Sequence, residues 1–190
     1  MKFTSLNVLI LILAGCVTLP DGVKPINDFD ASKYLGKWYE IARLDNRFEQ
    51  GMHNVTAEYQ LLDDKIKVIN RGYNIEENEF QQANGVAYPV SGESVGHLKV
   101  SFFRPFYGSY VIFHLDKESY QYSFVSGGNK EYLWLLARKP DIDQSIKDAF
   151  VKQSKALGFN LEHLIWVNQE TNLIENISDK TKTSEEVNHD

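Results

Sequence analysis

Apolar and polar residues alternate with a period of two through the middle of the chain. In residues 53–62, for example, Val55, Ala57 and Tyr59 alternate with polar neighbours. This pattern is typical of a strand with one buried face and one wet face. Turn residues separate similar runs, and we predict eight strands at 37–43, 53–62, 65–73, 80–88, 97–103, 107–115, 120–125 and 132–138. Eight antiparallel strands with short connections can close into a barrel wide enough for one small ligand.

One segment instead has the spacing of a helix. Pro140 and Asp141 give a start signal, and Gly158 gives a stop. The apolar residues between them fall on one face: Ile142, Ile146, Ala149, Phe150 and Leu157. Residues 163–167 then form a short apolar run typical of a strand. The prediction is an all-β fold, an eight-stranded antiparallel up-and-down barrel with one C-terminal α-helix packed outside and a short ninth strand.

The two ends of the chain have different patterns. Residues 1–15 combine a positive start at Lys2 with an apolar run too short to span a bilayer, which is typical of an export signal peptide. The run ends at Cys16 in a sequence that resembles the bacterial lipobox, although a chance cysteine after an ordinary signal peptide is the alternative. Cys16 is the only cysteine, so it has no disulfide partner within the chain and serves better as a lipid attachment point. We therefore expect a lipidated N-terminus and tether at 16–28, one domain at 29–169 and a polar, disordered tail at 170–190.

Charge and motif spacing exclude several function classes. The net charge of −6 argues against nucleic acid as a partner. The five histidines are isolated, so the sequence predicts no metal site and no cofactor. Ser94 stands in a match to the serine-hydrolase pattern at 92–96, but it lies between two predicted strands instead of between a strand and a helix. We predict no catalytic residue and no enzymatic activity.

Two segments resemble conserved motifs of the lipocalin family. Residues 34–42 resemble the motif that opens the first lipocalin strand, with Gly36 and Trp38 in its fixed positions. Residues 132–138 resemble the segment that ends in arginine, here Arg138, and the resemblance implies that this arginine packs over Trp38 at the closed end of the barrel. Asp116 occupies the centre of a third motif whose neighbours differ. The resemblance implies structural roles for these four residues.

The segments 99–108 and 165–167, together with the lipobox, narrow the resemblance to bacterial lipoprotein lipocalins of the Blc type, which are related to apolipoprotein D. This resemblance implies that the barrel binds a fatty acid or lysophospholipid, for lipid storage or transport and envelope maintenance. Val17 stands where an aspartate would retain a lipoprotein in the inner membrane, so we expect a lipid anchor in the outer membrane, at its periplasmic face. The expected partners are a small hydrophobic ligand and the membrane, and a homodimer is left open.

Alternation also predicts which residues face a ligand, and small side chains among them leave volume for it. The predicted lining, to which the resemblance adds Trp134, is Val55, Ala57, Tyr59, Ala83, Ala87, Leu98, Val100, Phe102, Tyr110 and Trp134. Candidate polar anchors for a head group are Tyr59, Asn70, Tyr110 and His114. The turn containing Arg104, Phe106 and Tyr107 either meets lipid at the mouth or is an ordinary turn. The alternatives are an enzyme acting on a lipid, which requires a polar pair with shifted pKa values, and a structural envelope protein with a filled barrel.

Overall fold

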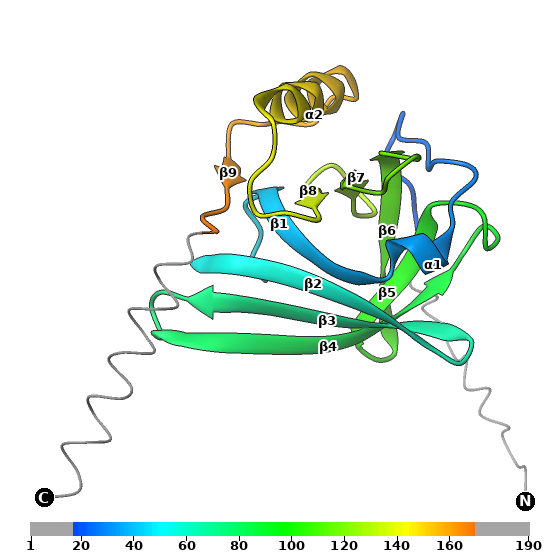
Figure 1. Ribbon diagram of the computed structural model, residues 1–190, viewed down its shortest axis with the longest axis horizontal. Coiled ribbons are helices and arrows are strands. Elements are labelled where there is room, and N and C mark those ends of the chain that lie inside the picture. Colours follow the sequence, from blue (N-terminus) through cyan, green and yellow to red (C-terminus); the bar gives the residue numbers. More distant parts are fainter. Residues whose placement is uncertain (1–16, 170–190) are drawn as a thin grey trace, which may run out of the picture.

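The computed structural model describes residues 17–169, which form a closed antiparallel barrel (Figure 1). Its strands are β1 Gly36–Leu44, β2 Met52–Leu62, β3 Lys65–Asn74, β4 Glu79–Pro89, β5 His97–Phe103, β6 Phe106–Leu115, β7 Tyr122–Ser126 and β8 Leu133–Ala137. Neighbouring strands pair in sequence order, and β1 pairs with both β8 and β2, which closes the barrel. The predicted fold is confirmed.

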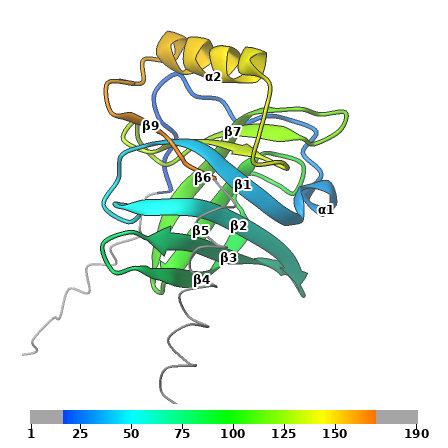
Figure 2. The same cartoon turned by 60° about the vertical axis from the view of Figure 1, so that its left-hand side comes forward.

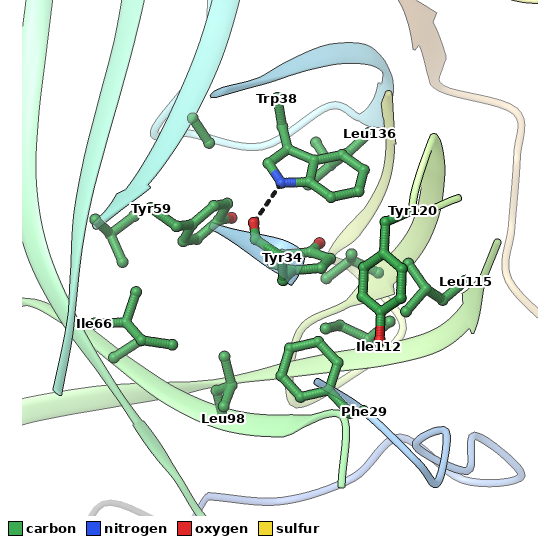
Figure 3. Packing of buried hydrophobic residues seen from close by; sticks show 14 residues of the cluster. Phe29, Tyr34, Trp38, Tyr59, Ile66, Leu98, Ile112, Leu115, Tyr120 and Leu136 are labelled. Carbon is green, nitrogen blue, oxygen red and sulfur yellow. Dashed lines mark hydrogen bonds between the residues drawn. The ribbon is translucent and has the colours of Figure 1, made fainter. Parts of the chain in front are cut away.

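The pairing register decides which side chains point inward. Directly paired residues share a face, and Trp38, Ala57, Asn70 and Ala83 form one such row across β1, β2, β3 and β4. The barrel interior holds a cluster of buried apolar side chains, called here the inner cluster, which includes Trp38, Ala57 and Tyr59 (Figure 3). Because Trp38 and Ala57 belong to it, the whole row faces the interior. Figure 3 shows Tyr59, Ile66, Leu98 and Leu136 converging on the same space.

The two ends of the barrel differ. The end where β1 begins is covered by the short helix α1 Ala31–Tyr34, which the sequence pattern did not predict. Its N-cap is Asp30, whose carboxylate accepts a hydrogen bond from the Ser32 amide at 2.9 Å. The opposite, open end carries the β1–β2, β3–β4, β5–β6 and β7–β8 loops.

A helix and a ninth strand cover part of the outside. Helix α2 Gln144–Ala156 crosses over the barrel in both views, and Phe150 is fully buried against Phe124 (Figure 2). The strand β9 Leu164–Trp166 pairs with β1. Helix α2 begins at Gln144, later than Pro140 indicated, and ends before Gly158, which has a φ of +80°. Within residues 17–169, no helix has the length and apolar character needed to cross a bilayer.

The segment 17–28, expected to be a tether, lies against the barrel. A second cluster of buried apolar side chains, called here the outer cluster, includes Val23, Phe124 and Phe150. The Ile26 amide donates to the Ile112 carbonyl at 2.9 Å. The Gly96 amide donates in turn to the Ile26 carbonyl at 2.9 Å. Residues 17–28 are therefore not a free tether, because Val23 and Ile26 bury apolar surface that a free linker would expose. The predicted signal peptide, Cys16 and the tail lie outside the described residues.

Strand β7 also begins two residues later than predicted. Tyr120 has a φ of +54° and lies in the turn before the strand, where its hydroxyl accepts a hydrogen bond from the Asp30 amide at 3.0 Å. The Asp116 carboxylate holds this turn by accepting from the amides of Ser119 and Gln121, at 3.4 and 3.2 Å. Local hydrogen bonding therefore overrides the aromatic pattern here.

Candidate ligand-binding site

The floor of the barrel is held by Arg138. Its guanidinium lies 4.0 Å from the Trp38 ring centre and donates to the carbonyls of Lys33 and Lys37 at 2.7 and 2.9 Å. The Trp38 indole donates in turn to the Tyr34 carbonyl at 2.8 Å (Figure 3). The expected packing of Arg138 over Trp38 is present, and these contacts seal the closed end.

Three tyrosines form a hydrogen-bonded cluster above this floor. The Tyr110 hydroxyl lies 2.8 Å from the Tyr34 hydroxyl and 2.9 Å from that of Tyr59, which donates to it. The Tyr34 hydroxyl also donates to Ser123 Oγ at 3.2 Å. Burial raises the pKa of Tyr34 to about 12 and those of Tyr59 and Tyr110 well above 10, so all three are neutral. Sequence reasoning missed Tyr34, which belongs to α1 and so lies outside any strand pattern.

The open half of the interior is less filled. Val100, Phe102, Tyr110 and Trp134 pack against the inner cluster but are only partly buried, and Ala83 is exposed on the inner face of β4. Gly108 pairs with Val100 and shares this face, and a Cβ added there would meet nothing within 4 Å. The inner face is therefore open beside Ala83 and Gly108.

One polar atom in this row lacks a partner. Asn70 lies between Ala57 and Ala83 in the register of β2, β3 and β4. Its Oδ1 is buried and makes no hydrogen bond. A buried acceptor without a partner costs free energy, which a ligand that brings a donor would recover. Of the four candidate anchors, Asn70 is therefore the one with a buried polar atom that has no hydrogen-bond partner.

The structure brings most of the predicted lining together. Ala57, Tyr59, Ala87 and Leu98 lie in the inner cluster, and Val100, Phe102, Tyr110 and Trp134 pack against it. Val55 is buried outside this cluster, near Gly72, where the pairing of β2 with β3 is irregular. His114 is not an inner anchor, because an irregularity in β6 places it against Phe124 of the outer cluster, with ring centres 4.5 Å apart.

Near the mouth, the structure contains a buried charge cluster that sequence reasoning missed. Arg43 Nη1 donates to Glu40 Oε1 at 2.8 Å, and both side chains are almost fully buried. Arg43 Nη2 donates to the carbonyls of Glu49 and Met52 at 2.6 and 3.1 Å. Arg43 thereby fastens the β1–β2 loop to the barrel wall.

Glu49 completes this cluster from the loop. Its carboxylate accepts from the Trp134 indole at 3.0 Å and from the Asn46 amide at 2.5 Å. Burial and the nearby Glu49 carboxylate raise the pKa of Glu40 well above 4.5. This is the kind of polar pair that the enzyme alternative requires, but these side chains are engaged with one another and with loop backbone. In the part of the chain that the structure describes, no group of three or more His, Cys, Asp or Glu side chains is placed to hold a metal ion.

A hollow lies on the outer surface, away from the barrel interior. It has a volume of about 510 Å³ and lies between α2 and β9, with Val151, Phe159 and Trp166 among its walls. Its walls include none of the residues predicted to line the ligand site.

Comparison with known proteins identifies the family. Residues 29–169 match the family described as "Lipocalin-like domain". The chain belongs to the lipocalin family. It is 54% identical over 161 residues to the outer membrane lipoprotein Blc of Vibrio cholerae, covering 84% of this chain and 94% of that protein. It is 34% identical over 128 residues to apolipoprotein D of Macaca fascicularis, covering 64% and 67% of the two chains.

Solved structures agree with this assignment. Insecticyanin from the tobacco hornworm Manduca sexta superposes with a TM-score of 0.64 at 18% identity, covering 82% of this lipocalin and 89% of that chain. This likeness concerns the fold. The bacterial relatives are outer membrane lipoproteins, which confirms the expected lipid-anchored localisation in the outer membrane.

Proposed function

We propose that this lipocalin binds one fatty acid or lysophospholipid in the open half of its barrel, for lipid storage or transport in envelope maintenance. The observation that carries the proposal is the difference between the two halves. Apolar side chains fill the closed half, whereas inward-facing Val100 and Phe102 are only partly buried and space remains beside Gly108. Each methylene buried there contributes about 0.8 kcal/mol, so an acyl chain supplies most of the binding free energy.

The polar part of the ligand would lie toward the mouth. Asn70 Oδ1 offers an unused acceptor to a hydroxyl or ammonium group beside the small side chains of Ala57 and Ala83. The protein would hold its ligand without converting it, because the buried Glu40 and Arg43 are tied to each other and to the loop. Acylation of Cys16 would keep this carrier at the periplasmic face of the outer membrane.

A test uses the chain from residue 17 onward, depleted of lipid and then offered fatty acids and lysophospholipids in native mass spectrometry. We expect one ligand per barrel, with unchanged ligand mass. Ala83→Trp places a large ring in the open half and should weaken binding at least tenfold. Gln82→Trp is the matched control, because Gln82 accepts from the exposed Arg71 side chain at 2.9 Å and so lies on the outer face.

The outcomes separate the alternatives. Retained ligand that Ala83→Trp displaces and Gln82→Trp does not supports binding in the barrel. No retained ligand supports the structural protein with a filled barrel. A ligand that loses mass on incubation supports the lipid-directed enzyme.

A further inference from the structure

The tip of the β5–β6 hairpin exposes two aromatic side chains. Phe103 and Phe106 pair across the tip and are 77% and 76% exposed, more than any other large hydrophobic residue among those described. Only Arg104 and Pro105 separate them. Adjacent exposed rings of this kind are typical of a surface that binds a membrane or another protein.

Cationic groups accompany these rings. The Lys99 ammonium lies 5.7 Å from the Tyr88 ring centre and 5.2 Å from that of Tyr107, and Arg104 donates to the Tyr88 hydroxyl at 3.2 Å. Positive charge is thus concentrated here in a chain with a net charge of −6. The β3–β4 hairpin at the same end is acidic, with three glutamates in residues 76–79. Aromatic rings beside basic side chains suit the interface of a bilayer with anionic head groups.

The N-terminal segment leads to the same place. Thr18 Oγ1 donates to the Gly128 carbonyl at 3.0 Å, and Ser109 Oγ donates to the Thr18 carbonyl at 2.6 Å. Ser109 is three residues from Phe106 along β6, about 10 Å. Cys16 is two residues from Thr18, at most about 7 Å of chain. The chain is therefore long enough for an acyl group on Cys16 to enter the same bilayer surface as the hairpin tip.

We propose that the β5–β6 hairpin tip docks into the bilayer surface beside the N-terminal lipid, which turns the open end of the barrel toward the membrane. The inference rests on acylation of Cys16, which is part of the proposed function. Phe103 and Phe106 enter the interfacial region, while Arg104 and Lys99 contact anionic head groups. A ligand then passes between bilayer and barrel with little exposure to water.

The test uses the mature acylated protein, which begins at Cys16, in vesicles of phosphatidylethanolamine and phosphatidylglycerol. Acylation occupies the thiol of Cys16, so a cysteine introduced by Phe103→Cys is the only free thiol and takes a fluorescent label. Leu61→Cys is the matched control, because Leu61 is 66% exposed on the β2–β3 hairpin at the closed end. We expect lipids carrying a nitroxide on the acyl chain to quench the label at 103 at least threefold more than the label at 61, and Arg104→Glu to reduce this difference.

Equal quenching at the two positions, or stronger quenching at 61, overturns the proposal. Intact mass establishes the acyl group beforehand. If the protein binds the vesicles but carries no acyl group on Cys16, the proposal is also overturned, because it requires that lipid anchor. Failure of the ligand-binding proposal is recognised separately, since retained ligand is measured without vesicles and without the anchor.

Discussion

At the scale of single residues, Arg138 links three parts of the closed end. It stacks on Trp38 and donates to carbonyls of α1, of β1 and, at 3.3 Å, of Tyr120 before β7. A cation–π contact contributes about 0.5–2 kcal/mol, and a hydrogen bond from a charged donor contributes about 1.5–3 kcal/mol. One side chain therefore stabilises the floor through several contacts that share a single rigid group.

We expect Arg138→Ala to lower the free energy of unfolding by about 2–4 kcal/mol. Arg138→Lys should recover only part of this loss, because an ammonium keeps the charge but lacks the planar fork. Urea denaturation measures both changes. The control is Lys139→Ala, at an exposed neighbouring position, which should change stability by less than about 0.5 kcal/mol. Similar losses in Arg138→Ala and Lys139→Ala would contradict this structural role.

Glu40 makes stability depend on pH. Its carboxyl has a pKa raised well above 4.5 in the folded state, because it is buried and lies near Glu49. Between 4.5 and that raised value, the folded state binds more protons than the unfolded state. The free energy of unfolding therefore falls as pH rises through this window.

Glu40→Gln should remove this decline, so the variant should gain stability over the natural protein as pH rises from about 4.5 toward 8. The glutamine oxygen can still accept from Arg43. Glu58→Gln is an opposite control, because hydrogen bonds from Gln60 and Arg71 lower the pKa of the Glu58 carboxyl and make its contribution largest at high pH. Urea titrations at several pH values measure both trends. A Glu40→Gln effect that is the same at every pH would show that the carboxyl does not titrate in this window.

The motif residues of the floor followed from the sequence, whereas the cluster at the mouth did not. Simple alternation places Glu40 and Arg43 on opposite faces of a strand. The pairing of β1 with β8 shifts between Glu40 and Ala42, which turns Arg43 to the same side as Glu40. Glu49 joins them only because the β1–β2 loop folds back. Neither event has a local signal in the chain.

At the scale of elements, one of the contacts that hold the N-terminal segment on the barrel is a close approach at Gly96. Gly96 lies between Ile26 and Ile112, and a Cβ added there would be 2.7 Å from Ile26 Cγ1 and 3.1 Å from the Ile112 carbonyl oxygen. The two hydrogen bonds that link Ile26 to Gly96 and Ile112 depend on this approach. Residues 17–28 are therefore part of the folded domain.

We expect Gly96→Ala to destabilise the fold by about 1–3 kcal/mol and to loosen the N-terminal segment, because an added methyl group overpacks this site. Gly108→Ala is the matched control, with nothing within 4 Å of its added Cβ, and should be close to neutral. Urea denaturation reports stability, and amide hydrogen exchange at Ile26 and Ile112 reports the segment. Unchanged exchange in Gly96→Ala would show that the segment is held by other contacts.

The period-two pattern located the eight barrel strands because each has one face in the core. The pattern was less informative where local hydrogen bonds and turns determine the backbone conformation. Helix α1 has one turn and is held by the Asp30 cap, and the positive φ of Tyr120 delays β7. Segment 17–28 is irregular, and it contacts residues far along the chain, such as Gly96. Long-range complementarity of this kind leaves no periodicity to detect.

At the scale of the whole molecule, the barrel combines a filled half with an open half. Buried aromatic residues and the Arg138 contacts stabilise the closed end. The open half can therefore remain less filled, while Arg43 and Glu49 hold the loop at its mouth. In the proposed function, the open half sets how much of an acyl chain the barrel can bury.

Affinity should therefore rise with acyl-chain length and then level off. Each methylene inside the open half contributes about 0.8 kcal/mol, so two more methylenes should lower the Kd roughly tenfold. A bound ligand raises the unfolding midpoint according to its concentration relative to its Kd, so a thermal melt with saturated fatty acids of graded length measures the series. Ala83→Trp should level off at shorter chains because its ring shortens the space, whereas Gln82→Trp should follow the natural protein. Midpoints that do not change with chain length would contradict burial of the acyl chain in the barrel, because each buried methylene should lower the Kd.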